Sequence, residues 1–232
     1  MDSSSSALLP SSLQHARINT LPETAYYIPN FITEQEEQNI LDKISSAPKP
    51  RWKQLTKRRL QTWPSDLANN KLLEAPLPLW LQDPVISRLL SMPSHDSSSA
   101  NIFERSPHKK PNHVLINEYP PGIGIMPHKM VQHTGRKEDG ALDPEPAWRI
   151  LQEPRSLLIT TSELYTDYLH GIADIEEDVD LSAETVANWD LLGSHGVYAN
   201  GRNIRQTRTS LTYRDVLQVS KVANKLGIFL KR

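Results

Sequence analysis

The sequence predicts an α+β protein in which helices from the first half of the chain pack against a β-sandwich or jelly roll. A helical pattern with a capping box comes early, near 33–44, whereas the clearest strand patterns come later, at 113–119 and 206–216. The chain has 232 residues, with 38% hydrophobic and 23% charged side chains. This length and composition fit one soluble globular domain, and we expect a monomer.

The first elements alternate between strand and helix. Residues 1–20 carry a serine run and no apolar core, which predicts a disordered tail rather than a signal peptide, followed by one domain over 21–232. Residues 25–28 form a short strand pattern that ends at Pro29. Thr33 and Glu36 form a capping box, and the helix after it is expected to stop before Pro48.

The middle of the chain is less regular. Residues 51–63 combine cations with aromatic rings, residues 72–90 are a helical stretch broken by prolines, and residues 91–111 are rich in Ser and Pro, as in an exposed loop. Residues 113–119 alternate like a strand and end at a Pro-Pro-Gly turn signal. No stretch is long and apolar enough to cross a bilayer.

The last third predicts four further elements. Residues 149–159 read as a strand pair, or as one strand interrupted at Pro154. Residues 162–170 and 182–192 show short helical patterns, the second ending at a glycine. Residues 206–216 are the clearest strand in the chain.

That last strand has an unusual polar face. Side chains alternate with period two, so one face carries Arg208, Ser210, Thr212 and Arg214. Two buried arginines are costly without partners, and a bound dicarboxylate would match their guanidinium forks. The alternative is an edge strand with a solvated polar face.

Further candidate site residues lie upstream of this strand. Asn117 and Tyr119 share a face at the end of their strand, and both can donate hydrogen bonds to an oxygen ligand. His128 follows the next turn, and His170 ends a short apolar segment. Two histidines of this kind can belong to the facial triad that suits non-haem Fe(II), although a lone loop histidine is more often solvated. The chain has no cysteine, which excludes disulfides and thiolate metal sites.

Taken in order, these motifs resemble the AlkB family of Fe(II)/2-oxoglutarate-dependent dioxygenases, in particular the branch of its sixth homologue. The resemblance covers the chain from about Leu21 onward. It is carried by these segments: Trp52-Lys53-x-Leu55, Arg58-Arg59-Leu60-Gln61-x-Trp63, Asn117-x-Tyr119, Met126-Pro127-His128, Glu153-Pro154-Arg155-Ser156-Leu157-Leu158, His170-Gly171-Ile172 and Arg208-x-Ser210-x-Thr212-x-Arg214.

The resemblance implies a double-stranded β-helix, the jelly-roll core of this family, preceded by helices. It implies that His128 and His170 bind iron and that Arg208 pairs with the distal carboxylate of 2-oxoglutarate. Asn117, Tyr119, Ser210 and Arg214 would complete the cosubstrate pocket. The implied reaction is hydroxylation or oxidative demethylation, typically of an N-methyl group on nucleic acid.

The sequence departs from the family directly after His128. The family has His-x-Asp followed by glycine and two core strands, whereas this chain has Lys129 and Met130, and methionine cannot replace a hard carboxylate ligand. The sequence therefore predicts a jelly roll that lacks core strands. Residues 129–136 are either a splicing or gene-model artefact or the mark of a degenerate isoform, and Asp139 and His133 are alternative third ligands.

Three functions are compatible with these patterns. The first is an oxygenase acting on nucleic acid, bound through the basic-aromatic stretch; its members are Arg51, Trp52, Lys53, Lys57, Arg58 and Arg59. The stretch is equally compatible with a solvated basic helix face whose tryptophans lie in the core. The second function is a catalytically inactive nucleic-acid or protein binding module, and the third is an oxygenase acting on a protein side chain. Residues 57–59 also resemble a nuclear targeting patch, so we expect a protein of the cytoplasm and nucleus.

Overall fold

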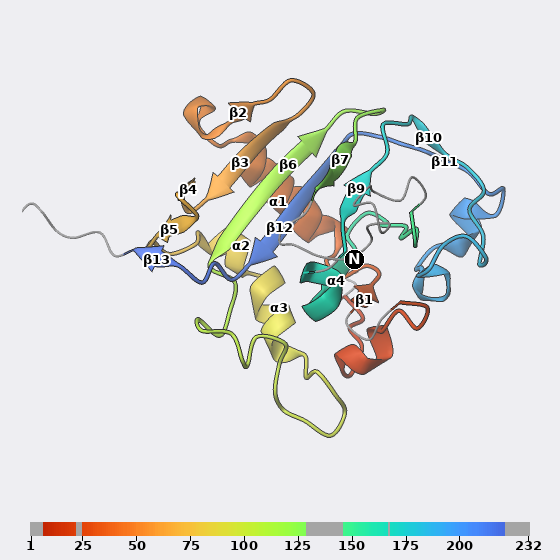
Figure 1. The fold of residues 1–232 in the computed structure, drawn as a ribbon, viewed down its shortest axis with the longest axis horizontal. Helices are drawn as coiled ribbons and strands as arrows, with labels where there is room; N and C mark the ends of the chain where they lie inside the picture. Colours follow the sequence, from red (N-terminus) through yellow and green to blue (C-terminus); the bar gives the residue numbers. More distant parts are fainter. Residues whose placement is uncertain (1–6, 22–24, 129–145, 167, 221–232) are drawn as a thin grey trace, which may run out of the picture.

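The computed structural model describes residues 7–21, 25–128, 146–166 and 168–220. Within these ranges the chain forms helices and several small, mostly antiparallel sheets, which agrees with the α+β class (Figure 1). The strands that the sequence predicts to be missing after His128 fall on residues outside this description. None of the described helices is long and apolar enough to cross a membrane.

The N-terminal segment packs into the molecule from Leu9 onward, whereas Leu8 is 91% exposed. A 3-10 helix, η1 (Leu13–Ala16), buries Leu13 and Ala16, and Ile18 is also buried. The Leu13 amide donates to the Pro93 carbonyl at 2.9 Å, and the Ile18 amide donates to Ala25 at 3.0 Å. The predicted disordered tail over 1–20 is therefore wrong for residues 9–20, because their few apolar side chains find partners distant in sequence.

Helix α1 (Glu34–Ser45) begins as the sequence predicts. The Thr33 hydroxyl accepts from the Glu36 amide at 3.2 Å, and the Glu36 carboxylate accepts from the Thr33 amide at 2.8 Å, which completes the capping box. Glu36 also binds Arg88 of α3. Ile40 and Ile44 are buried on the inner face of the helix.

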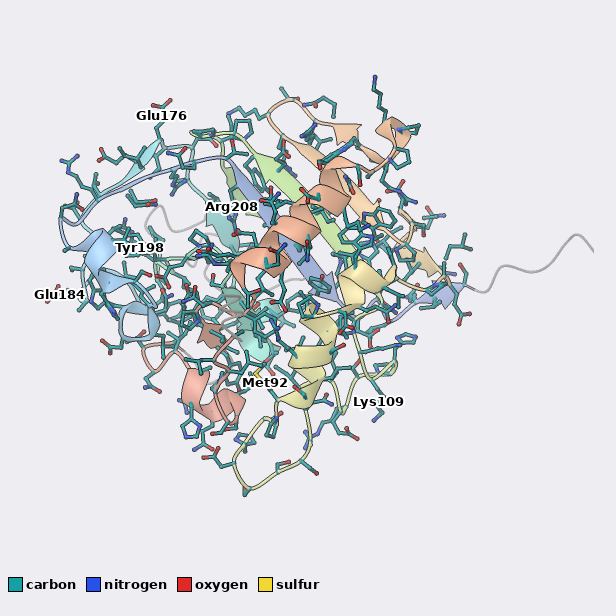
Figure 2. The ribbon with its side chains drawn as sticks, turned by 180° about the vertical axis from the view of Figure 1, so that it is seen from behind. Met92, Lys109, Glu176, Glu184, Tyr198 and Arg208 are labelled. Atoms are coloured by element: carbon teal, nitrogen blue, oxygen red, sulfur yellow. The ribbon has the colours of Figure 1, made fainter. Side chains whose placement is uncertain are left out.

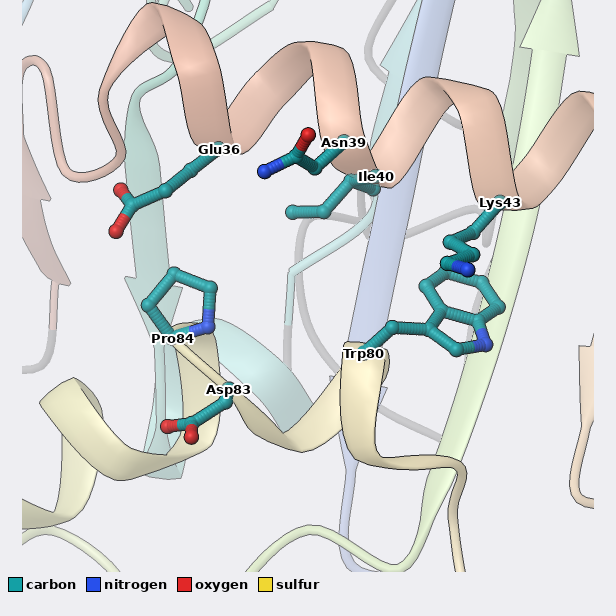
Figure 3. Close-up of a pocket in the computed structure, with 7 residues that line it drawn as sticks. All are labelled: Glu36, Asn39, Ile40, Lys43, Trp80, Asp83 and Pro84. Atoms are coloured by element: carbon teal, nitrogen blue, oxygen red, sulfur yellow. The ribbon is translucent and has the colours of Figure 1, made fainter.

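Two short helices continue this layer. α2 (Leu79–Gln82) begins after Pro78 and α3 (Val85–Ser91) begins after Pro84, so the prolines divide the predicted broken helix. A cavity of about 110 Å³ lies between α1 and these helices, with Ile40, Trp80 and Pro84 among its lining residues (Figure 3). Its polar groups belong to the helix surfaces, and none of the predicted site residues lines it.

The central sheet has four antiparallel strands in the order β12-β6-β3-β2. Their bounds are β12 (Arg208–Arg214), β6 (His113–Tyr119), β3 (Arg59–Trp63) and β2 (Lys53–Gln54). One face of this sheet packs on the helices: Val114 and Ile116 are fully buried there, and Leu211 and Tyr213 pack against the same cluster. Figure 2 shows α1 crossing this face of the sheet.

The remaining strands form small sheets of two or three strands. β1 (Ala25–Ile28) pairs with β8 (Leu157–Thr160), and β7 (Ile125–His128) pairs with β9 (His170–Ile172), in both cases antiparallel. The others are β10 (Glu177–Asp178) with β11 (Asn203–Ile204), and β13 (Val219–Ser220) with β5 (Lys71–Leu73) and β4 (Leu67–Ala68). The short helices are η2 (Lys49–Arg51), α4 (Ser162–Thr166), η3 (Trp189–Leu191) and η4 (His195–Tyr198).

Three predicted elements differ from the structure. In the predicted helical segment 162–170, helix α4 ends at Thr166 and His170 begins strand β9. Residues 149–159 form a loop followed by the single strand β8, and residues 182–192 are turns that end in η3 rather than a helix. The cause is Asn188, whose buried side chain accepts from the Leu151 amide at 2.9 Å and donates to its carbonyl at 2.8 Å. These two hydrogen bonds hold residues 149–159 and 182–192 in extended or turn conformations, and they override the local preference of the second segment for a helix.

Candidate functional site

The polar face of the central sheet lies opposite the helices, and the strand register sets which of its residues are neighbours. We define this polar face by the predicted residues Asn117, Tyr119, Arg208, Ser210 and Arg214. Arg208 pairs with Tyr119, and Ser210 pairs with Asn117 in the ladder between β12 and β6. Residues directly opposite each other share one face of an antiparallel pair, so these four form two adjacent rows.

Arg214 lies at the other end of the same strand. It pairs with His113, six residues from the Arg208–Tyr119 pair. At roughly 3.3 Å per residue, the Cα atoms of the two arginines are about 20 Å apart along β12. The structure therefore brings four of the predicted cosubstrate residues together and leaves Arg214 beside His113.

The two predicted iron ligands occupy opposite positions in another ladder. His128, at the end of β7, is the Cα partner of His170, at the start of β9. Both figures of the whole chain show these strands beside the end of the central sheet that carries Arg208 (Figures 1 and 2). Residues 42 positions apart in sequence thus meet at the same end of the sheet as the Arg208–Tyr119 row.

The four clustered residues fit a carboxylate ligand. The Arg208 guanidinium donates to the neutral amide oxygen of Gln152 at 3.0 Å. Burial lowers the pKa of Arg208, and the nearby charge of Arg205 acts in the same direction, whereas Tyr119 acts in the opposite direction. Asn117 is 5% exposed, and its buried Oδ1 has no hydrogen-bond partner in the part of the chain that the structure describes. Amide oxygen and nitrogen positions are interchangeable assignments, so a rotated Asn117 amide would offer a donor to the same ligand.

The hydroxyl of Tyr119 remains protonated at neutral pH. Burial raises the pKa of Tyr119, although the nearby charges of Arg58 and Arg208 act in the opposite direction. The side chain is only 2% exposed. A buried, protonated phenol next to a guanidinium is a suitable hydrogen-bond donor to a carboxylate oxygen.

The metal half of the site is described only in part. Among the described residues, no group of three His, Asp or Glu side chains is placed to hold a metal ion. The side chain of His128 lies outside that description, as do Met130 and the alternative ligands His133 and Asp139. The backbone register fits two histidines of a facial triad, and the third ligand falls on residues that the structure does not describe.

The strands that carry the histidines are locked together by close backbone contact. The Gly124 amide donates to the Asp174 carboxylate at 2.5 Å, which ties the start of β7 to the end of β9, and Asp174 also binds Lys57 at 2.7 Å. A Cβ atom at Gly124 would lie 1.9 Å from the Ile172 carbonyl oxygen. Only glycine allows this approach. Neither the need for glycine at position 124 nor the role of Asp174 could be predicted from the sequence, because a close contact between two distant backbone segments leaves no local pattern.

We therefore expect Gly124→Ala to separate β7 from β9 and to disturb the His128–His170 pair. A displacement of about 1 Å at a reacting site costs on the order of 100-fold in rate. The measurement is Fe(II)-dependent release of succinate from 2-oxoglutarate, together with the melting temperature. Gly196→Ala is the matched control, because no atom of the described residues lies within 4 Å of its added Cβ. Unchanged turnover in Gly124→Ala would show that the β7–β9 register is not needed.

The basic-aromatic stretch is a β-hairpin rather than a helix, and most of its cations are engaged within the chain. Arg51 donates to the Thr62 and Pro64 carbonyls and lies over the Trp63 ring at 4.1 Å. Lys53 binds Asp66 at 2.5 Å. Trp52 and Trp63 are partly buried and pack against the main core. The interpretation of this stretch as a solvated basic helix face was therefore wrong about the helix but right that the tryptophans pack on the core.

The end of the hairpin follows the same pattern, with one exception. Arg59 binds both carboxylate oxygens of Glu118, at 2.6 and 2.9 Å, and lies over the Trp52 ring at 4.1 Å. Lys57 is paired with Asp174. Arg58 instead faces the Tyr119 ring, and no described residue forms a hydrogen bond with its buried Nε atom. Exposed pairs such as Lys57–Asp174 contribute little stability and can exchange for a phosphate.

Several known proteins are similar to this chain in sequence. No family model matches the chain. The chain is 35% identical over 235 residues to a zebrafish (Danio rerio) protein named "Probable RNA/DNA demethylase ALKBH6", covering 90% of this chain and 93% of that protein. It is 28% identical over 109 residues to "Alkylated DNA repair protein ALKBH8 homolog" from Arabidopsis thaliana, covering 44% of this chain and 28% of that protein.

Proposed function

Because this chain belongs to the AlkB family, we propose that it is an Fe(II)/2-oxoglutarate-dependent dioxygenase that oxidises alkyl groups on nucleic acid. The names of its relatives, a probable RNA/DNA demethylase and an alkylated DNA repair protein, support this substrate class. We further propose that the central sheet is one wall of a double-stranded β-helix. The β1–β8 and β7–β9 pairs would belong to the opposing wall.

One observation carries the proposal. The strand register places Asn117, Tyr119, Arg208 and Ser210 in adjacent rows at the end of the sheet that lies beside β7 and β9, where His128 and His170 are direct partners. This arrangement gathers an anion receptor and two metal-binding side-chain types at one place. The pocket is built on these four residues, since Arg214 lies about 20 Å away along β12.

Each residue has a physical role in this proposal. Arg208 would hold the distal carboxylate of 2-oxoglutarate with its planar fork. Tyr119 and Asn117 would donate hydrogen bonds to the same ligand, and Ser210 would lie behind them in the next row. His128 and His170 would hold Fe(II), which when bound supplies the site for oxygen activation.

The test is an anaerobic titration of the full chain with Fe(II) and 2-oxoglutarate, followed by the visible charge-transfer absorption of the ternary complex. We expect a saturable band that is lost in His128→Ala and in His170→Ala. His95→Ala, on the exposed loop after α3, is the matched control and should keep the band. Two histidines alone can still hold a divalent metal. The affinity for Fe(II) will be lower than in a three-ligand site, because one ligand is lost.

A folded wild-type chain without such a band would contradict the proposal. The alternative function, a catalytically inactive module that binds nucleic acid or protein, would then account for the chain. Loss of His170 separates the two functions. If the chain is an oxygenase, the loss abolishes succinate release; if it is an inactive module, binding of nucleic acid or protein stays unchanged.

A further inference from the structure

Arg58 extends the Arg208–Tyr119 row across the sheet. Arg59 pairs with Glu118 in the ladder between β3 and β6, so Arg58, one residue earlier, lies next to Tyr119. Arg208 pairs with Tyr119 from the other side. The guanidinium carbons lie 5.7 Å and 5.9 Å from the centre of the Tyr119 ring, so the two cations flank one buried phenol.

Neither cation of this row has a carboxylate partner within the described part of the chain. Among the described residues, Arg58 keeps a buried Nε atom without a hydrogen bond, and the hydrogen bond of Arg208 goes to the neutral amide of Gln152. The neighbouring cations differ, since Lys57 binds Asp174 and Arg59 binds Glu118 through two bonds. A half-buried guanidinium without a counter-charge is less stable than one paired with an anion, so an anion that contacts both arginines would offset this cost.

We propose that Arg58 is a second cosubstrate-binding residue that holds the distal carboxylate of 2-oxoglutarate jointly with Arg208. This inference rests on the proposed function. The two ring distances set an upper limit of about 12 Å on the separation of the guanidinium carbons, and both forks would turn toward one carboxylate held beside the Tyr119 ring. A small anion fits this place better than a polymer phosphate, because Tyr119 beside the two arginines is 2% exposed and the Arg58 Nε atom is buried.

The test is calorimetric titration of 2-oxoglutarate into the full chain saturated with Mn(II) in place of Fe(II). Loss of a charge-assisted hydrogen bond predicts at least about tenfold weaker binding for Arg58→Ala. Arg58→Lys, which keeps the charge but not the fork, should lie between Arg58→Ala and wild type. Arg202→Ala is the matched control, since it removes the same charge from an exposed pair with Glu177 and should bind as wild type does.

A second ligand identifies which end of 2-oxoglutarate Arg58 contacts. 2-Oxobutyrate has the same keto acid end but lacks the distal carboxylate. The affinity of Arg58→Ala for 2-oxobutyrate should therefore stay within about twofold of wild type, a difference in binding free energy well below one kcal/mol. An equal loss for both ligands would overturn the proposal. So would unchanged 2-oxoglutarate affinity in Arg58→Ala combined with weakened binding of a single-stranded oligonucleotide, which would assign Arg58 to the substrate.

The proposed function and this inference fail in different ways. If wild type binds no 2-oxoglutarate, both are wrong. If wild type binds and Arg208→Ala loses the ligand while Arg58→Ala and Arg58→Lys bind normally, only the assignment of Arg58 is overturned.

Discussion

Arg208→Ala is expected to weaken 2-oxoglutarate binding by about 100-fold or more and to abolish succinate release at ordinary cosubstrate concentrations. Each hydrogen bond from a guanidinium to a carboxylate contributes about 1.5–3 kcal/mol, and a bidentate fork makes two of them. The measurement is calorimetric titration of the Mn(II)-loaded chain. Arg208→Lys should recover part of the affinity, because it restores the charge without the fork.

The stability of the Arg208 variant separates a binding role from a structural one. Burial lowers the pKa of Arg208, so the folded protein disfavours the charged side chain. Removing it should therefore leave the melting temperature unchanged or slightly raised. A large drop in melting temperature with normal 2-oxoglutarate affinity would show that Arg208 supports the sheet and not a ligand.

The second large effect is a loss of stability in acid that depends on His113. This residue is fully buried on β6, and its Nδ1 atom accepts a hydrogen bond from Arg214 Nε at 3.3 Å. Burial, reinforced by the charge of Arg214, lowers the pKa of His113 from 6.5 to about 4; Ser65 and Asp66 act weakly in the opposite direction. The neutral imidazole is the form that the fold accommodates.

The sign of the pH effect follows from proton binding. Between pH 6.5 and about 4, unfolded His113 is protonated and folded His113 is not, so the unfolded state binds more protons. The free energy of unfolding should therefore fall by about 3 kcal/mol as the pH drops through this window. Urea unfolding at a series of pH values measures it.

A variant isolates this contribution from the other histidines. His113→Gln keeps a hydrogen-bond acceptor for Arg214 but cannot titrate, so its unfolding free energy should depend less on pH over the same window. If His113→Gln and wild type lose stability in parallel, His113 is not the group responsible. Period-two alternation places His113 on the face of Asn117 and Tyr119, which is the signal that sequence reasoning passed over.

Local sequence determined the elements whose information is contained within a few residues. The capping box of Thr33 and Glu36 forms as predicted, and the strands 25–28 and 113–119 have the predicted bounds. Alternation along 208–214 correctly separated Leu211 and Tyr213, which pack on the helices, from the polar set. Period and capping are properties of the chain itself, which is why these predictions needed no tertiary contact.

Only the tertiary structure decided how these pieces combine. The sequence gives no register between strands about 90 residues apart, so it could not show that Arg208 meets Tyr119 while Arg214 lies at the far end beside His113. Nor could it show that Asn188 clasps Leu151 and prevents a helix, or that Leu13 and Ile18 fill the core. Each of these depends on burial and hydrogen bonding between distant segments, whose free energies exceed the local preferences that a sequence pattern reports.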